Sequence, residues 1–185
     1  MPTICAPYNR VARAPRLRHN EDAVLSIPLI RFATAQDAHA IAEMSRDYIE
    51  HGLGWSWTTR RVRAAIGDPC SNAIAIGARG AIIGFGIMQY GEFSAHLALL
   101  AVHPDRRQRG LGARLIDWLE QPARIAGIER ILVEARADNP RAIAFYCQHG
   151  YAQCGRVSRY YRGLIDAVQL EKRLAAPVHE SRSVP

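Results

Sequence analysis

The sequence contains little cysteine, no long hydrophobic run and fewer acidic than basic residues. Its four cysteines, Cys5, Cys70, Cys147 and Cys154, lack the paired Cys-x-x-Cys spacing of zinc sites. They are also too sparse for a secreted disulfide scaffold. We therefore expect reduced thiols, a cytoplasmic location and no bound metal. No apolar stretch approaches the ~20 residues that cross a bilayer, so no membrane segment is expected.

Basic residues dominate the charge, with 24 lysines and arginines against 17 aspartates and glutamates, and a formal net charge of +7. This balance suits an anionic cofactor, an acidic protein or a nucleic acid. Nucleic acid is the least favoured of the three, because the basic segments lack interleaved aromatic residues.

A chain of 185 residues predicts one domain with a sizeable core. Residues 1–26 carry prolines and arginines without an apolar signal core or a structural period, so we expect a flexible basic arm. The sequence leaves open whether this arm is a processed targeting peptide or an upstream extension. The domain is expected over residues 27–174, and residues 175–185 have the composition of a tail.

Hydrophobic periodicity predicts strands and helices over the domain. Ala73–Gly77 and Ala81–Tyr90 flank a turn signal and predict a hairpin, followed by an apolar strand, Ala95–Val102, buried on both faces. Pro122 is expected to kink or end the helix that precedes a strand over Ile131–Ala135. The other expected elements are a strand over Ile27–Arg31, a helix opened by Thr34 and Asp37 and closed by Gly52, a helix over Thr58–Ile66, and a helix from Asn139 to Gly150.

A glycine-rich stretch, Arg107-Gln108-Arg109-Gly110-Leu111-Gly112, joins the expected strand Ala95–Val102 to a helical pattern. Gly110 and Gly112 lack a Cβ and let a phosphate approach the backbone, and the first amides of a helix have no intrahelical acceptor. Arg106, Arg107 and Arg109 add positive potential. We therefore predict a phosphate cradle; the alternative is an ordinary strand-to-helix turn with solvated arginines.

Two common nucleotide-binding motifs do not fit this stretch. A Walker loop ends in Gly-Lys-Ser/Thr, where this chain has Gly112-Ala113-Arg114. The dinucleotide-binding fingerprint needs a third small residue, where this chain has Leu115.

The stretch instead resembles the coenzyme A pyrophosphate loop of GNAT superfamily acetyltransferases, which reads Arg/Gln-x-x-Gly-x-Gly/Ala after a strand ending in Val-x-Pro. The resemblance continues through residues 131–139 and 142–146 to Gly150-Tyr151. It implies an α/β (α+β) single-domain fold with a mixed, mostly antiparallel central sheet flanked by helices. It also implies acetyl-CoA as the acetyl-donating cosubstrate, with no metal.

By the same resemblance, two side chains carry the chemistry of direct transfer in a ternary complex. Bacterial ribosomal-protein alanine N-acetyltransferases have a glutamate twelve residues before the tyrosine, a spacing that Glu134 and Tyr146 share. Glu134 would act as general base through water, and Tyr146 would give its proton to the coenzyme A sulfur. The alternatives are a buried salt bridge from Glu134 to Arg136 or Arg159, and a Tyr146 half in the core.

The resemblance assigns the other donor contacts to three segments. They are Leu100, Ala101 and Val102 on the strand, Arg107, Gln108, Arg109, Gly110, Leu111, Gly112 and Ala113 in the loop, and Asn139 at the next helix start. The strand is expected to splay from its neighbour and expose its amides to the pantetheine arm, so unbroken pairing through Val102 would contradict this. Asn139, Ala142 and Tyr146 share one helix face, along which the arm could run.

The acceptor is expected to be an amine, with a protein N-terminal α-amine first and a small amine second. Trp55 and Trp57 lie in a region that borders the acceptor pocket in the family, although core packing explains them equally well. Tyr160 and Tyr161 resemble the paired tyrosines of N-terminal acetyltransferases; a structural hairpin is the alternative. A coenzyme A-binding module without turnover is the competing class of function, and the choice between monomer and homodimer stays open.

Three further residues are weaker candidates. His103 and His149 lie at a turn and before a helix-ending glycine, where histidines are commonly surface residues. Cys147 would need a neighbouring base and is expected to be a small buried thiol. No cluster with metal-ligand spacing occurs in the sequence.

Overall fold

One seven-stranded sheet organises the computed structural model, which describes residues 29–174. The strands are β1 (Ile30–Phe32), β2 (Ser71–Ala78), β3 (Ala81–Tyr90), β4 (Ser94–Val102), β5 (Arg130–Arg136), β6 (Ala152–Tyr161) and β7 (Ile165–Arg173). The helices are α1 (Ala38–Tyr48), α2 (Thr59–Gly67), α3 (Leu111–Ile125) and α4 (Pro140–Gln148), with a short 3-10 helix η1 (Pro104–Arg106). The predicted arm over residues 1–26 and the tail over 175–185 lie outside the described residues.

The sheet is mixed and mostly antiparallel, as predicted. Its order is β1-β2-β3-β4-β5-β7-β6, and every neighbouring pair is antiparallel except β4 and β5. The predicted β2–β3 hairpin turns at Arg79-Gly80, where Gly80 has a φ of +74° that suits glycine. Parallel strands need a long crossover, and α3 supplies the one between β4 and β5.

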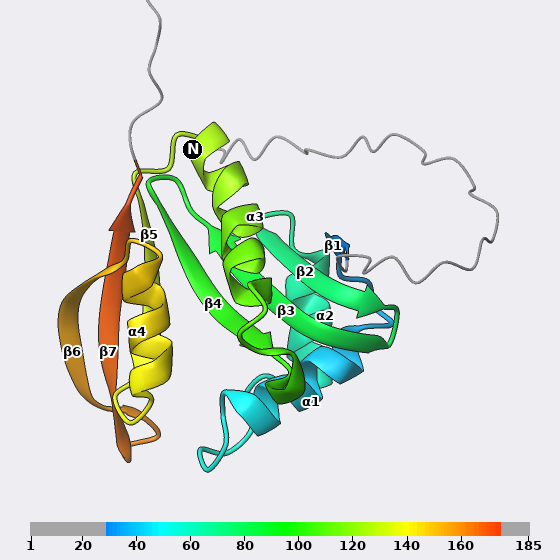
Figure 1. The fold of residues 1–185 in the computed structure, drawn as a ribbon, viewed down its shortest axis with the longest axis horizontal. Coiled ribbons are helices and arrows are strands. Elements are labelled where there is room, and N and C mark those ends of the chain that lie inside the picture. The colour runs from blue at the N-terminus through cyan, green and yellow to red at the C-terminus, as the bar shows by residue number, and fades with distance from the viewer. Residues whose placement is uncertain (1–28, 175–185) are drawn as a thin grey trace, which may run out of the picture.

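Helices cover both faces of this sheet (Figure 1). On one face, α3 and α4 contribute Leu115, Leu119 and Tyr146 to a buried apolar cluster. On the other face, α1 and α2 contribute Ile41 and Val62 to a second cluster. Among residues 29–174, no helix is both long enough and apolar enough to cross a bilayer.

A β-bulge in β4 lets this strand contribute side chains to both apolar clusters. Met88 is paired with Leu97 but Ile87 with Leu99, so Ala98 is the extra residue. Leu97 belongs to the α3–α4 core and Leu99 to the α1–α2 core, although residues two apart in a regular strand share a face. We expected this strand to be buried on both faces. Only every second residue of β4 is buried, and the residues between them are half-buried, so the expectation is half right.

β4 and β5 pair for a short distance and then separate. Their parallel pairing joins only Ser94–His96 with Arg130–Leu132. Beyond His96 the strands diverge (Figure 1), while β4 stays paired with β3 as far as Val102. The edge of β4 over residues 97–102 that faces β5 thus has no strand partner. The predicted splay is present in the fold.

Two helix boundaries differ from the expectation. Pro122 does not end α3, which continues to Ile125; a proline removes one N–H, and the Pro122 carbonyl still accepts from the Ala126 N–H at 2.9 Å. The helix α1 begins at Ala38 and ends at Tyr48, so neither Thr34 nor Gly52 bounds it.

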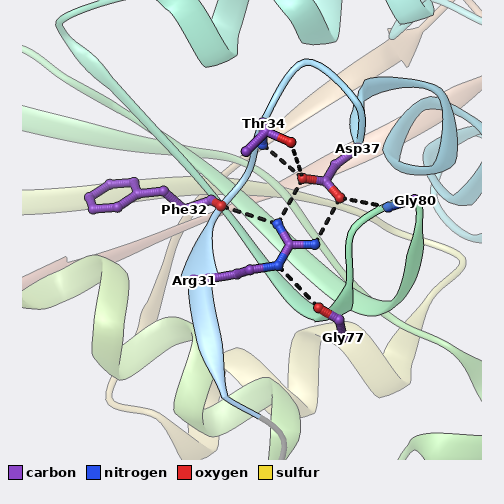
Figure 2. Close-up of polar contacts among 6 residues, drawn as sticks. All are labelled: Arg31, Phe32, Thr34, Asp37, Gly77 and Gly80. Atoms are coloured by element: carbon purple, nitrogen blue, oxygen red, sulfur yellow. Dashed lines mark hydrogen bonds and ion pairs between the residues drawn. The ribbon is translucent and has the colours of Figure 1, made fainter. Parts of the chain in front are cut away.

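The start of α1 is displaced because Asp37 is committed to another network (Figure 2). Its carboxylate accepts from both terminal nitrogens of Arg31, at 2.7 and 2.8 Å, and from the N–H groups of Thr34 and Gly80. Arg31 also donates to the Gly77 carbonyl at 3.1 Å. The network joins β1, the start of α1 and the β2–β3 turn.

Candidate active site

The glycine-rich loop presents backbone N–H groups. Gly110 is the residue before α3 and has a left-handed φ of +71°, which lets the Arg114 N–H reach the Gly110 carbonyl at 3.1 Å. Among the described residues, the N–H groups of residues 108–113 have no hydrogen-bond acceptor. Six consecutive free donors at a helix N-terminus make a cradle for an anion.

Gly112 is needed for a reason that the sequence did not reveal. A Cβ built on Gly112 would lie 3.1 Å from the Phe145 ring of α4, whereas one on Gly110 would meet nothing within 4 Å. A side chain at 112 would thus be tight against the Phe145 ring, which would have to shift by a few tenths of an ångström, and the left-handed backbone favours glycine at 110.

Arg107 ties the loop to the end of β4. Its Nε donates to the Val102 carbonyl at 3.1 Å, and its guanidinium lies 5.8 Å from the Tyr48 ring centroid. Leu100, Ala101 and Val102 lie on the part of β4 that has no partner on the β5 side. The loop and this free edge are thus adjacent, as the sequence prediction requires.

The helix α4 starts and ends as predicted. The Asn139 side-chain carbonyl accepts from the Ala142 N–H at 3.1 Å, which leaves the Asn139 amide N–H groups available, and Gly150 follows with a φ of +85°. Tyr146 is 8% exposed. Burial, with a smaller effect of Tyr161, raises the pKa of the Tyr146 phenol, and no hydrogen bond offsets the shift. Tyr146 therefore keeps its proton at neutral pH, and it lies partly in the core as well.

A cavity of about 310 Å³ lies between the α1–α2 connection, β4, β5 and the end of β6. Its walls include four of the predicted site residues, Trp57, Glu134, Tyr160 and Tyr161. Tyr146 does not line it.

The two tryptophans have different positions. Trp57 is 8% exposed, lines the cavity and packs in the α1–α2 core, with the Arg61 guanidinium 4.1 Å from its ring centroid. Trp55 does not line the cavity; its Nε1 donates to the Trp57 carbonyl at 3.0 Å. The described geometry therefore does not bring Trp55 to the site.

Glu134 pairs with a histidine rather than with an arginine. His96 Nε2 lies 2.5 Å from Glu134 Oε2. Arg136 instead pairs with Asp138 at 2.7 Å, and the Arg159 backbone N–H donates to Asp166, so the alternative of a salt bridge from Glu134 to either arginine is not formed. The His96 hydrogen bond lowers the pKa of Glu134 more than partial burial raises it. His96 was not singled out from the sequence, although a polar residue inside an apolar run was the available signal.

Two other contacts that organise the cavity were also missed. Glu50 accepts from the N–H groups of Ser56 and Trp57, at 2.9 and 3.1 Å, and so holds the α1–α2 connection in place. Arg136 donates to the carbonyls of Ile49 and His51, at 3.5 and 2.5 Å. The Arg136 partners are 85 and 87 residues away in the chain, so no local pattern could have indicated them.

The weaker candidates lie elsewhere. His103 accepts from the Asp105 N–H at 3.3 Å, and His149 Nδ1 lies 2.7 Å from the Phe145 carbonyl, so both are used in local structure. Cys147 is exposed, and the expectation of a buried thiol is wrong. Within residues 29–174, no group of three or more histidine, cysteine, aspartate or glutamate side chains is placed to hold a metal ion.

Residues 38–151 match the model of the acetyltransferase (GNAT) family. The chain belongs to this family. The matched region contains the glycine-rich loop, His96, Glu134, Asn139 and Tyr146. The sequence resemblance to the GNAT superfamily is thereby confirmed.

Individual members of the GNAT family are similar over parts of the chain. N-alpha-acetyltransferase RimI of Mycobacterium tuberculosis is 29% identical over 110 residues, which cover 57% of this chain and 68% of that one. Streptothricin acetyltransferase of Streptomyces lavendulae is 32% identical over 92 residues, which cover 49% of each chain. The chain thus matches about half the length of the latter relative.

A solved GNAT structure confirms the fold. The ribosomal-protein-S18-alanine N-acetyltransferase of Escherichia coli superimposes with a TM-score of 0.68 at 24% identity, covering 82% of this chain and 98% of that one. This likeness establishes the mixed sheet with flanking helices as the GNAT fold.

Proposed function

We propose that this protein is an acetyl-CoA-dependent N-acetyltransferase that acts on a primary amine, with a protein N-terminal α-amine as the leading acceptor. The single observation that carries the proposal is that an anion cradle and a cavity with a carboxylate both lie beside β4, where it diverges from β5. An anion cradle with free N–H groups at residues 108–113 lies at the end of β4. A cavity containing the carboxylate Glu134 lies beside the same strand.

The residues present fit coenzyme A. A diphosphate matches the free N–H groups at residues 108–113, and the exposed Arg106 and Arg109 add positive charge beside them. The unpaired edge of β4 and the free amide of Asn139 offer hydrogen bonds to an extended amide-containing arm. When bound, acetyl-CoA supplies a thioester as the acyl donor.

Glu134 and Tyr146 divide the proton transfers between them. An ammonium group cannot attack a carbonyl until it loses a proton, and the ionised Glu134 in the cavity accepts that proton, directly or through water. The protonated Tyr146 donates its phenolic proton to the departing thiolate. Neither residue forms a covalent intermediate with the acyl group, so transfer is direct.

The walls of the cavity support a peptide amino terminus as the acceptor. Tyr160 and Tyr161 approach edge to face, with ring centroids 5.0 Å apart, and line the cavity opposite the α1–α2 connection. Several similar proteins are N-alpha-acetyltransferases, which favours a peptide amino terminus. We further propose a cytoplasmic protein, either a monomer or a homodimer, that binds no metal.

The proposal is tested by incubating the full chain with acetyl-CoA and either free-amino-terminus peptides or a panel of small amines. Mass spectrometry should show an acetyl group on the peptide α-amine, and thiol release should follow the same acceptors. Acetylation of small amines alone would move the assignment to a small-molecule acetyltransferase. Binding of acetyl-CoA without thiol release above background would instead identify the protein as a coenzyme A-binding module without turnover.

Substitution Glu134→Gln tests the general base. It should lower kcat/KM by about 100-fold or more near neutral pH, because the acceptor ammonium then loses its assisted deprotonation. The loss should shrink above about pH 9, where α-amines are already neutral. The pH dependence of kcat/KM provides the measurement, with Glu92→Gln on the exposed surface as control. Equal losses at low and high pH would refute the base assignment.

A further inference from the structure

His96 lies where β4 and β5 begin to diverge. It is the last residue of β4 paired with β5, opposite Leu132. Glu134 follows Leu132 by two residues, so these two β5 side chains share a face. The side chains of His96 and Glu134 therefore meet across the start of the splay, and both line the 310 Å³ cavity.

The contact between them is close and only partly shielded from solvent. Nε2 of His96 lies 2.5 Å from Oε2 of Glu134, with side-chain exposures of 40% and 16%. Because an ionised carboxylate only accepts hydrogen bonds, the imidazole supplies the proton of this bond. The Gln169 side chain on β7 also contributes a hydrogen bond to Glu134, with a smaller effect.

The other polar groups around the cavity have different partners. Glu50 accepts from the backbone of its own connection, and Arg61 stacks on Trp57. The Tyr161 hydroxyl donates to the Glu134 backbone carbonyl at 3.1 Å, not to its carboxylate. The remaining titratable or polar groups lining the cavity are Ser56, whose hydroxyl donates to Glu50, Tyr160 from β6, Arg162 from the β6–β7 turn and Gln89 from β3. His96 thus makes the closest contact recorded with the Glu134 carboxylate among the described residues.

We propose that His96 is a positioning residue for acetyl transfer: its N–H keeps the Glu134 carboxylate ionised and aimed into the acceptor cavity. This inference rests on the proposed function, in which Glu134 is the general base. It adds a residue that acts through the base and does not itself touch the reacting atoms.

The choice of an imidazole suits an acceptor that arrives as a cation. A guanidinium or ammonium beside Glu134 would carry a permanent charge, repel the incoming ammonium and weaken the carboxylate as a base. An imidazole donates the same hydrogen bond without a permanent charge.

The first test needs no substrate. Carbon-13 NMR of the full chain follows the Glu134 carboxyl through a pH titration, with its signal assigned by its absence in Glu134→Gln. In His96→Leu, which removes the donor, the carboxyl should titrate at higher pH than in the wild type. His96→Gln keeps a donor and should lie between the two. The control is His39→Gln, since His39 lies near Glu43 on the exposed face of α1.

The second test measures kcat/KM against pH for the same variants. Relative to the wild type, His96→Leu should lose about tenfold more activity near pH ~5.5 than near pH ~8.5, because a less ionised base fails first in acid. His96→Gln should recover part of the low-pH activity, and His39→Gln should follow the wild type. Near-ultraviolet circular dichroism checks that each variant is folded.

An unchanged titration of the Glu134 carboxyl in both His96 variants would overturn the proposal. A shifted titration with an unchanged pH profile would also overturn it, because the pairing would then not serve the reaction. If the wild type acetylates no amine at all, the proposed function fails instead. The carboxyl titration still reports by itself whether His96 controls Glu134.

Discussion

Two carboxylates with lowered pKa values, the buried Asp37 and the half-buried Glu134, show how surroundings decide what a residue does. Asp37 has no exposed surface, and its oxygens accept from Arg31, Thr34 and Gly80 (Figure 2). The Arg31 hydrogen bonds are the largest cause of the lowered pKa of Asp37. Glu134 keeps an exposed edge in a cavity and is paired with an imidazole. The first carboxylate is saturated and structural, whereas the second remains accessible to an acceptor.

Asp37→Asn should lower the free energy of unfolding by about 3 kcal/mol at neutral pH, because it leaves Arg31 without its ion partner. The pKa of Asp37 in the folded state is below its unfolded value, so this stabilisation is complete above the unfolded pKa. It is lost as the pH falls through the folded pKa, and the difference between the two proteins should narrow in acid. Urea unfolding at several pH values measures this.

The matched control for Asp37 is Asp47→Asn. Asp47 also pairs with an arginine, Arg46 at 2.7 Å, but both side chains are about half exposed. This variant should stay close to the wild type in unfolding free energy. An Asp37→Asn protein that is equally close to the wild type would contradict the structural role.

At the scale of elements, the donor side of the site is the junction of a strand and a helix. The loop between β4 and α3 leaves N–H groups free because Gly110 enters the helix from a left-handed backbone conformation. The helix then packs closely on α4 through Gly112 and Phe145. The position of the anion cradle thus depends on two factors, the local backbone geometry and the packing of the helix.

Gly110→Ala should destabilise the protein by about 1 kcal/mol, because a left-handed φ is unfavourable for residues with a Cβ. It should also weaken coenzyme A binding, since relief of the strain reorients the neighbouring amides. Gly127→Ala is the control: Gly127 has the same φ of +71°, nothing within 4 Å of a built Cβ, and no place in the loop. Its stability loss should be similar, with unchanged coenzyme A affinity by isothermal titration calorimetry. Equal coenzyme A affinities for the two variants would count against the cradle.

At the scale of the whole molecule, Arg136 links the donor and acceptor sides. Its guanidinium pairs with Asp138, just before the Asn139 helix start, and donates to the carbonyls of Ile49 and His51 after α1. The α1–α2 connection and the β5–α4 junction are thereby held together. The acceptor cavity is a property of this assembly and of no single element.

Arg136→Lys should loosen the α1–α2 connection, because an ammonium cannot form the bidentate bond to Asp138 and reach two carbonyls as well. Amide hydrogen exchange over residues 49–57 should accelerate, and the KM for the acceptor should rise about tenfold with a smaller change in kcat. Arg130→Lys at the exposed start of β5 serves as control. Unchanged exchange over residues 49–57 would contradict the linking role.

Much of the architecture was predictable because its signals are local. Strand and helix periods predicted the hairpin, β4, β5 and α2 within a few residues. The β4–β5 splay and the Asn139 cap were also predicted correctly. The roles of Glu134, Tyr146 and the loop in catalysis and binding stay predictions, while Trp55 falls outside the cavity.

For two carboxylates, the structure adds partners that the sequence pattern does not report. Asp37 was interpreted as part of a helix cap; its carboxylate accepts from Thr34 but also from Arg31 and Gly80, and α1 begins at Ala38. For Glu134 the sequence offered a general base, with a salt bridge to Arg136 or Arg159 as the alternative; its carboxylate is paired with His96 across the splay instead of with an arginine. Which side chains pair depends on their distance in space, and the periodicity of a sequence does not give that distance.

The glycine spacing, the adjoining strand and helix, and the placement of Glu134, Asn139 and Tyr146 predicted the family, which the match over residues 38–151 confirms. They also predict the donor, because phosphate binding at a helix N-terminus uses consecutive backbone groups. The tertiary structure alone decided the acceptor side. His96 meets Glu134, and Arg136 meets His51, only after β4, β5 and the α1–α2 connection assemble, since these contacts span 38 and 85 residues.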